Sequence, residues 1–498
     1  MKFTTGAFAA GLVLVPLAAQ ADLTITNKPT KNVSCADGTC TATAKMAALN
    51  ATDLANMLAT TDVSLIGFKG QDVVVGKIAQ WAGTHHLSMS SSRNVRVYAP
   101  LVAMGTSGLA ITYNTSRKGG TLSFGPKGRI ELWDTASTLA INGVSYTPVA
   151  DLATLAADVA SNASGNYALA NDYDASADGR YSSAPIGASF FGRFEGLGNT
   201  ISKLAIRGRH PGASLALFGD DRGSVSDLRM THVSITGQES SSVGGIAADL
   251  DGTISGSSVA GNLSAGANST VGGLVGQMLG GTVQSSQSTG TVTGNDSDST
   301  TASMAGGLIG QIISASDVTT SFSTAKVTGG TGWRIGGLIG SNVGDVEDCY
   351  ATGTVLVGDN GFAGGLIGEN SGTLVANSYA TGFVDGTTGT TVGGFIGHNS
   401  AAVQTSYSSG AVASGSGNAV GGFIGTDSGP SDLTNTYFDV ETSGQSHGVG
   451  NNTGYPGVTA LTTAQFMAGL PTGFDPLVWA ESPVINSGLP YLLALLPI

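Results

Sequence analysis

Short apolar runs separated by small and polar residues recur along the whole chain. Early runs of this kind lie at 73–75, 95–98, 109–113 and 139–142. Apolar residues that alternate, or that run on between turn residues, are typical of strands. Ala, Leu and Asp recur at helical spacing at Ala51–Leu58 and Val149–Val159, which predicts two short helices. The pattern therefore predicts a chain built mainly from β-strands.

From residue 244 onward the pattern becomes a repeat of two glycines, two apolar residues and a third glycine. Seven copies occur, and their starts differ by 28, 34, 30, 28, 29 and 28 residues. The first copy, Gly244-Gly245-Ile246-Ala247-Ala248, lacks the third glycine. The other copies have their paired glycines at Gly272 and Gly273, Gly306 and Gly307, Gly336 and Gly337, Gly364 and Gly365, Gly393 and Gly394, and Gly421 and Gly422.

This period identifies the architecture. Each unit holds three short β-prone runs separated by Gly, Asn, Asp and Ser, which is what one coil of a three-sided parallel β-solenoid needs. Glycine is abundant, at 76 of 498 residues, because it permits positive φ at corners and close approach of neighbouring backbones. The glycines match no phosphate-binding loop, since each cluster recurs in every coil and no helix pattern follows it.

The N-terminus has the features of an export signal. Lys2 precedes an apolar run from Ala7 to Ala18, and Ala19-Gln20-Ala21 gives the small-x-small pattern of a cleavage site. Cleavage is expected between Ala21 and Asp22. The run is shorter than the roughly 20 residues of a spanning helix, and no transmembrane span is expected in the mature chain. The apolar residues 491–496 are also too short to span, and we expect them to cover an exposed end of the core.

An exported chain with three cysteines allows one disulfide, and Cys35 and Cys40 form the only local pair. Cys349 occupies a repeat position where other units have Ser378 and Ser406. We therefore interpret Cys349 as a buried small residue rather than a nucleophile.

Charge is distributed unevenly. Residues 1–210 carry 17 Lys and Arg against 13 Asp and Glu, whereas residues 211–498 carry 4 against 21. No Lys or Arg follows Arg334, so the C-terminal part offers no cationic groove for phosphates or acidic glycans. Nucleic acid is therefore not expected as a partner.

These motifs resemble a known group of proteins. The glycine units followed by Asn377-Ser378-Tyr379-Ala380-Thr381-Gly382 look like the GLUG repeats of filamentous-haemagglutinin-like bacterial surface proteins. Phe194–Ile201 and Tyr437–Gly444 are similar to the segments that precede and close such arrays, so the resemblance covers roughly residues 60–498. It implies a right-handed parallel β-helix, export with an outer-membrane export partner, and adhesion at the cell surface, and it supplies no catalytic residues.

The repeat and its flanks divide the chain into five segments. We expect a signal peptide at 1–21, an N-terminal β-rich segment at 22–145, a connecting segment at 146–235, the repeat solenoid at 236–440 and a closing, capping segment at 441–498.

Candidate chemistry is sparse. A lyase needs a basic residue beside bound Ca²⁺, and within the repeats only Lys326 and Arg334 are candidates, neither beside an acidic cluster. A glycosidase needs two carboxylates, and the densest acidic group is Asp345, Glu347 and Asp348, which we interpret as solvated turn charge.

No metal or cofactor is expected. The six histidines show no zinc-ligand spacing. Asp296 and Asp298 resemble half of a Ca²⁺ loop but lack its glycine and its final glutamate. 

Two further residue types recur in the repeats. Tyr350, Tyr379, Tyr407 and Tyr437 share one offset, and we expect them to point inward and fill corners rather than outward toward glycans. A threonine row like that of ice-binding solenoids is not expected, because the coils differ at Thr291–Thr293, Lys326–Thr328 and Phe383–Asp385.

The sequence thus predicts an all-β, exported solenoid, secreted or held at the cell surface, that binds an extracellular glycan or protein like an adhesin and is not an enzyme. Two alternatives remain open. One is a polysaccharide-active β-helix enzyme, either a lyase or a glycosidase, and the other is a scaffold of the extracellular matrix.

Overall fold

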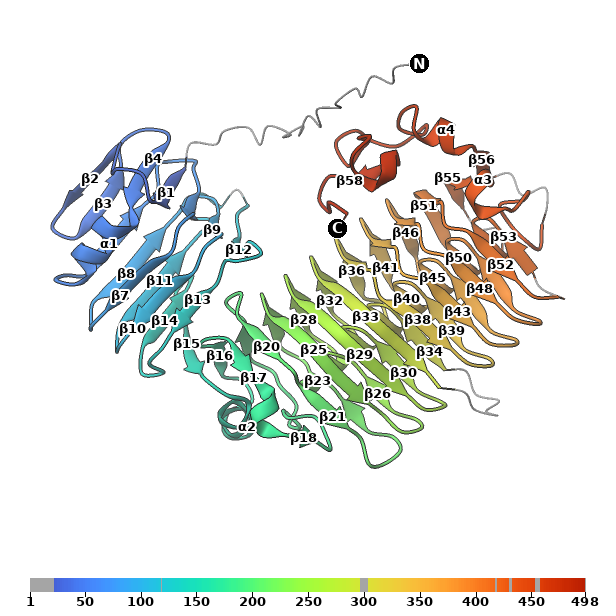
Figure 1. The fold of residues 1–498 in the computed structure, drawn as a ribbon, viewed down its shortest axis with the longest axis horizontal. Coiled ribbons are helices and arrows are strands. Elements are labelled where there is room, and N and C mark those ends of the chain that lie inside the picture. The colour runs from blue at the N-terminus through green and yellow to red at the C-terminus, as the bar shows by residue number, and fades with distance from the viewer. Residues whose placement is uncertain are drawn as a thin grey trace, which may run out of the picture. The chain divides into compact units, whose positions relative to one another are not determined.

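The computed structural model describes residues 22–117, 119–295, 303–416, 419–429, 432–452 and 457–497. The predicted signal peptide, including Ala21, lies outside these ranges, as do Asp296 and Asp298. The chain is a β-solenoid of about 14 turns with a spacing of about 28 residues and parallel sheets, and only 7% of it is helix, which confirms the predicted fold class (Figure 1). None of the helices among the described residues is long and apolar enough to cross a membrane.

The chain forms two compact units, and the first comprises residues 1–129 and 136–145. Its strands form parallel ladders that stack one coil on the next. One sheet has the order β12 (Leu122–Phe124), β9 (Val95–Val97), β6 (Val73–Val75), β1 (Leu23–Thr26) and β4 (Ala47–Asn50). A second ladder runs through β3 (Thr39–Ala42), β5 (Val63–Ile66), β8 (His86–Ser90), β11 (Gly108–Thr112) and β14 (Thr138–Ile141), and a third side holds β7 (Ala79–Ala82) and β10 (Leu101–Met104).

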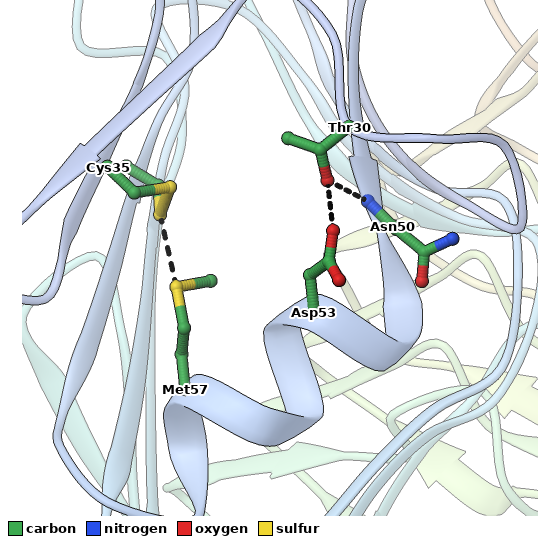
Figure 2. Close-up of a disulfide and its surroundings, with 6 residues drawn as sticks. Thr30, Cys35, Asn50, Asp53 and Met57 are labelled. Atoms are coloured by element: carbon green, nitrogen blue, oxygen red, sulfur yellow. Dashed lines mark hydrogen bonds between the residues drawn. A yellow bond between two sulfur atoms is a disulfide. The ribbon is translucent and has the colours of Figure 1, made fainter.

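A hairpin and a helix complete this unit. A disulfide joins Cys35 of β2 (Val33–Ala36) to Cys40 of β3, and the two strands are antiparallel. The helix α1 (Ala51–Leu58) lies where the sequence pattern predicts it, and the Asn50 side chain caps it by accepting the Thr52 N–H. Figure 2 shows Met57 of this helix beside the disulfide, with its Sδ 3.8 Å from Cys40 Sγ.

The second unit comprises residues 130–135 and 146–498 and holds the repeats. Helix α2 (Leu152–Ser161) begins three residues later than predicted, because Asp151 caps it by accepting the Thr154 N–H. One eight-stranded parallel sheet contains β22 (Ser214–Leu215), β26 (Ser242–Val243), β30 (Thr270–Gly272), β34 (Met304–Gly306), β39 (Arg334–Gly336), β44 (Phe362–Gly364), β49 (Thr391–Gly393) and β53 (Ala419–Gly421). The next contains β23 (Phe218–Asp221), β27 (Ala247–Leu250), β31 (Val275–Met278), β35 (Ile309–Ile312), β40 (Ile339–Asn342), β45 (Ile367–Asn370), β50 (Ile396–Asn399) and β54 (Ile424–Asp427).

The third side of each coil consists of three successive ladders, and the short ladder between the two described next contains β20 (Thr200–Ser202), β37 (Phe322–Ser323), β42 (Tyr350–Ala351) and β47 (Tyr379–Ala380). The first ladder runs through β19 (Arg193–Glu195), β24 (Ser224–Ser226), β28 (Thr253–Ser255), β32 (Thr282–Gln284), β36 (Asp317–Thr319), β41 (Asp345–Glu347), β46 (Leu374–Ala376), β51 (Ala402–Ser408) and β55 (Leu433–Asp439). The second ladder runs through β18 (Arg180–Tyr181), β21 (Ala205–Arg207), β25 (Arg229–Thr236), β29 (Ser258–Ala265), β33 (Gln287–Gly294), β38 (Lys326–Gly329), β43 (Val355–Val357), β48 (Val384–Gly386) and β52 (Val412–Ser414).

The paired glycines of the repeat allow backbones to approach closely. A methyl group on Gly364 would overlap the carbonyl oxygen of Ile367, and one on Gly365 would overlap the carbonyl oxygen of Gly394 in the next coil. The same overlaps recur in the neighbouring units. The sequence also predicted that glycine is needed here for positive φ. None of the twelve paired glycines has a positive φ, so that reason does not apply to them.

Positive φ falls instead on a corner row of mostly non-glycine residues, where φ lies between +46° and +58°. The row consists of Asp227, Gly256, Ser285, Thr320, Asp348, Asn377, Thr405 and Asn435. Asn and Asp tolerate this left-handed conformation better than other residues with side chains. The recurrent acidic and amide residues of this turn therefore have a backbone role.

Inside the solenoid, an aliphatic row gives way to an amide row. Leu250, Met278 and Ile312 occupy successive coils, and buried Asn342, Asn370 and Asn399 continue the same row. Asn342 Nδ2 donates to Asn370 Oδ1 at 2.8 Å, and Asn370 Nδ2 donates to Asn399 Oδ1 at 2.8 Å. Each amide thereby satisfies its neighbour in the interior.

The recurrent aromatic residues lie outside this core. Tyr350 is followed by Ala351, which packs in the interior, so strand alternation points the tyrosine to the outer side. We call Phe322, Tyr350, Tyr379, Tyr407 and Tyr437 the aromatic row; their first four rings stack with centroids 4.6, 4.9 and 5.2 Å apart. The prediction that these tyrosines fill corners inside the solenoid is therefore wrong.

The aromatic row is nevertheless buried, because residues 463–497, the C-terminal segment, cover it. This segment holds α4 (Thr463–Phe466), β57 (Trp479–Ala480) and β58 (Tyr491–Leu492), and Figure 1 draws it in red, folded back over the last coils. Trp479 lies 6.1 and 6.0 Å from the rings of Tyr379 and Tyr407. The apolar residues 491–496 thus cover a side of the solenoid, where Leu492 packs with the aromatic row. The sequence had suggested that they cover the open end of the core.

Candidate functional site

Two parallel rows of mainly polar side chains lie on the outer side of β21, β25, β29, β33 and β38. One row aligns Ala205, Ser234, Asn262, Thr291 and Lys326, and the other aligns Arg207, Thr236, Ser264, Thr293 and Thr328. Together these ten residues form what we call the polar face. Four spacings of about 4.8 Å between neighbouring strands make it about 19 Å long.

Strand alternation produces this face. The residues between the two rows, Ile206, Ile235, Leu263, Val292 and Val327, point inward and are buried. Their partners on the outer side are half-buried or exposed. Each coil therefore anchors one strand by an aliphatic side chain and presents a polar residue on either side of it, except that Ala205 takes one of these places in β21.

Neighbouring polar groups on the face are close enough to interact. The Thr291 hydroxyl donates to Asn262 Oδ1 at 2.7 Å, and Ser264 Oγ lies 3.4 Å from Thr236 Oγ1. Hydroxyl side chains therefore align over these coils, with Ser264 among the threonines. Thr236, Ser264, Thr293 and Thr328 align although the coil that contains residues 296–302 is longer than the others, because β33 and β38 keep their register. Leu356 and Asp385 then end the row in the next two coils.

The first unit holds a separate pocket of about 780 Å³, lined in part by Lys28, Lys31 and Lys45. The amide of Asn32 ties its two loops together by donating to the Lys45 carbonyl oxygen at 3.2 Å. Met46, which also lines it, is 70% exposed and has a φ of +57°. In Figure 2, Thr30 on the same loop bridges the start of α1, because its hydroxyl donates to Asp53 and accepts the Asn50 N–H.

The acidic group singled out in the sequence has a structural role. Asp345 Oδ1 accepts the Leu374 N–H at 3.0 Å, and Glu347 Oε1 accepts from Asn377 at 3.4 Å. Asp348 belongs to the corner row with positive φ, and burial, followed by the charge of Glu347, raises its pKa. The basic candidates lie elsewhere: Lys326 ends the polar face, and Arg334 pairs with Glu369 at 2.5 Å.

The sequence did not indicate a second acidic group, Glu195 with Asp227. Glu195 is buried, accepts the Leu197 N–H at 3.0 Å and the Ser226 hydroxyl at 2.7 Å, and has its pKa raised by burial to about 7. Burial, with the charge of Glu195, also raises the pKa of Asp227. The two residues belong to adjacent coils, so only the coil register brings them together.

Cys349 and the metal candidates can be placed as well. Cys349 is buried, its N–H donates to the Ser378 hydroxyl at 3.1 Å, and burial raises its pKa to about 12, as expected for a small core residue rather than a nucleophile. Among the described residues, no three His, Cys, Asp or Glu side chains gather in a way that could hold a metal ion. Asp296 and Asp298 are outside that part of the chain.

Comparison with known proteins supports the repeat. The family model for the GLUG motif matches residues 331–356, which span the end of one coil and the start of the next, so this unit of the repeat is similar to the GLUG motif. A search of curated proteins found no match.

The fold was also compared with solved structures. A crystal structure of a candidate immunoglobulin A1 protease from Bacteroides ovatus is 17% identical, with a TM-score of 0.41, over 70% of this chain and 93% of that one. A structure named IgA1 Protease is 16% identical, with a TM-score of 0.32, over 57% of this chain and 20% of that one. Both similarities are distant.

The names of these two structures bear on the prediction that the chain is not an enzyme. Both describe an enzyme, which contradicts the prediction that the chain is not one. The physical reason is that a solenoid scaffold accepts catalytic and binding residues on its faces and loops alike, so a lack of familiar motifs in the sequence does not exclude catalysis.

Proposed function

We propose that the protein is an exported, adhesin-like surface protein that binds an extracellular polysaccharide along the polar face. The observation that carries the proposal is the alignment of Thr236, Ser264, Thr293 and Thr328, with Ser234, Asn262 and Thr291 beside them. A polysaccharide carries hydroxyl groups at regular intervals. The hydroxyl and amide groups of the polar face also repeat at regular intervals, so they can form hydrogen bonds to successive sugars.

The scaffold keeps the loss of conformational entropy on binding small. The rows stand on strands whose inner residues are packed in the core, so few side chains and no loops need to be ordered when a ligand binds. Several weak hydrogen bonds then add up along one extended ligand. Export is supported by the small-x-small signal pattern and by the GLUG motif, with the cell surface as the proposed location.

The test is binding of the purified protein to a polysaccharide array, followed by titration of the polymers that bind. The variant Thr293→Val/Thr328→Val removes two hydroxyls of the row and keeps β-branched side chains. The matched control, Thr253→Val/Thr282→Val, makes the same change in β28 and β32, on the other ladder of the same coil side.

We expect saturable binding that the Thr293/Thr328 variant weakens at least tenfold and that the control leaves unchanged. Release of reducing or unsaturated sugars is measured in the same wells, so that turnover of a bound polymer is seen directly. An array without saturable binding, or an equal loss in the control variant, would refute the proposal.

A further inference from the structure

A small basic pocket lies at one end of the polar face. It has a volume of about 410 Å³, and Arg180, Arg207 and Arg209 line it together with Tyr181, Ser182 and Gln238. Three successive coils contribute these residues. Arg180 opens β18, Arg207 closes β21, and Gln238 follows β25 in the next coil.

The register directs the arginines to one outer corner. Arg180 is aligned with Ala205, so Arg180 and Arg207 stand on the same outer side of adjacent strands, and both are exposed. Arg209 follows after Gly208. The corner is held in place because Gln238 Nε2 donates to the Gly208 carbonyl oxygen at 3.3 Å.

The walls of the pocket are also fixed from the first coil. Tyr181 is half-buried and packs against the main core, and its hydroxyl donates to Asp178 Oδ2 at 2.7 Å. Asp178 accepts a second hydrogen bond from Tyr173, so this carboxylate is engaged by two tyrosines. The other acidic neighbour in the sequence, Glu239, does not line the pocket.

The three guanidinium groups have no acidic partner among the described residues. Other cations of this unit do have one: Lys203 pairs with Asp174, and Arg222 pairs with Asp220. Three unneutralised positive charges in one small pocket repel one another, and this happens in a chain whose net charge is −13. An anion bound between them would relieve the repulsion, and the planar fork of arginine suits the two oxygens of a carboxylate or sulfate.

The position of the pocket indicates the kind of molecule that carries this anion. Arg207 begins the row that continues through Thr236, Ser264, Thr293 and Thr328, and Arg180 lies beside the start of the other row. A polymer lying on the face therefore runs directly into the pocket.

We propose that this pocket binds the acidic group of a polysaccharide, a sulfate ester or a uronate carboxylate, while the polymer lies along the polar face. The inference rests on the proposed function and names its ligand class as an acidic polysaccharide. The acidic C-terminal coils repel such a polymer, so its acidic group is expected at the end of the face where Arg180, Arg207 and Arg209 lie, with the rest of the chain along the polar face.

The experiment compares three probes by titration of the full protein: heparin for sulfate, polygalacturonate for carboxylate, and dextran as a neutral polymer. The variant is Arg207→Gln, and the matched control is Arg193→Gln, which removes another exposed arginine that does not line the pocket. Arg207→Lys keeps the charge and loses the fork. Circular dichroism checks that each variant is folded.

We expect heparin or polygalacturonate to bind at least tenfold more tightly than dextran, and the preferred acid identifies the group that the pocket holds. Arg207→Gln should remove most of that preference, Arg207→Lys should remove part of it, and Arg193→Gln should leave it intact. Binding should also weaken as salt is raised.

The outcomes separate this inference from the function on which it rests. The pocket proposal is refuted if acidic polymers bind no better than dextran, or if Arg193→Gln weakens their binding as much as Arg207→Gln does. The proposal that the polar face binds polysaccharide is still supported in that case if Thr293→Val/Thr328→Val weakens binding. Failure of all three polymers to bind overturns both.

Discussion

Substitution of one repeat glycine by alanine should have a large effect on stability for a purely geometric reason. A methyl group on Gly365 would overlap the carbonyl oxygen of Gly394, which belongs to the next coil. The chain can relieve this overlap only by moving the two coils apart. We therefore expect Gly365→Ala to destabilise the stacking at this point although it adds a single carbon atom.

The magnitude follows from the contacts on either side. Overpacking a core by one methyl group typically costs about 1–3 kcal/mol. Moving the coils apart also strains two backbone hydrogen bonds between them, from Gly365 N to Gly393 O at 3.2 Å and from Leu366 N to Phe395 O at 2.8 Å. Each such bond contributes about 1 kcal/mol. The sum is a loss of about 4 kcal/mol, confined to one interface because each coil contacts only its neighbours.

Gly187→Ala is the matched control. There the nearest atom to the added carbon is the Ala184 carbonyl oxygen at 3.7 Å, an ordinary contact, and φ is not positive. This change should stabilise the chain by roughly 0.4–1 kcal/mol, since alanine loses less backbone freedom than glycine on folding.

Urea unfolding followed by circular dichroism measures both variants, and hydrogen exchange of peptides from 364–397 locates the damage. A Gly365→Ala protein within 1 kcal/mol of the parent would refute the geometric reasoning. If that protein kept its stability but lost polysaccharide binding, the repeat glycines would have a ligand role instead.

Three further changes test other features. Asn370→Ala breaks two bonds of the amide row and should cost about 1–3 kcal/mol in urea unfolding, whereas the exposed Ser371→Ala should cost little; equal effects would argue against the row. Trp479→Ala should cost about 3–5 kcal/mol and make the C-terminal segment sensitive to protease before the coils unfold, with Leu477→Ala, 84% exposed, as the unaffected control. Burial raises the Glu195 pKa from 4.5 to about 7, so the folded state binds this proton more tightly than the unfolded state, and stability should fall as pH rises through that range. Glu195→Gln should reduce the decrease in the free energy of unfolding between pH 4.5 and 7 by roughly 3 kcal/mol, measured by urea unfolding at several pH values. Parallel pH profiles for parent and variant would contradict the raised pKa of Glu195.

Local pattern was enough to predict the coil and most strands. The glycine units recur at nearly constant spacing, and a period near 28 admits few architectures besides a solenoid, so the fold class followed from the chain alone. Helix α1 and strands such as β6 and β9 were also predictable, because each depends on residues within one short window.

Features that depend on alignment between coils were not predictable. The side on which Tyr350 lies is decided by strand alternation, which places Cys349 and Ala351 in the interior, and no pattern in the chain indicates which residues of this strand face inward. The polar face and the arginine pocket need the register of strands that lie many residues apart, such as Arg180 beside Ala205. The candidate site was therefore not predicted, because the sequence shows its residues but not which of them lie side by side.

The C-terminal segment also has a consequence for how the protein is made. Synthesis runs from the N-terminus, so the aromatic row emerges before the residues that cover it. At about 5–20 residues per second, the delay between Tyr350 and Trp479 is on the order of 10 s. During this time the finished coils carry a bare strip of stacked rings, which is a target for chaperones or for a second nascent chain. Arrival of Trp479 closes that strip, so synthesis of the C-terminal segment is also the step that protects the aromatic row from aggregation.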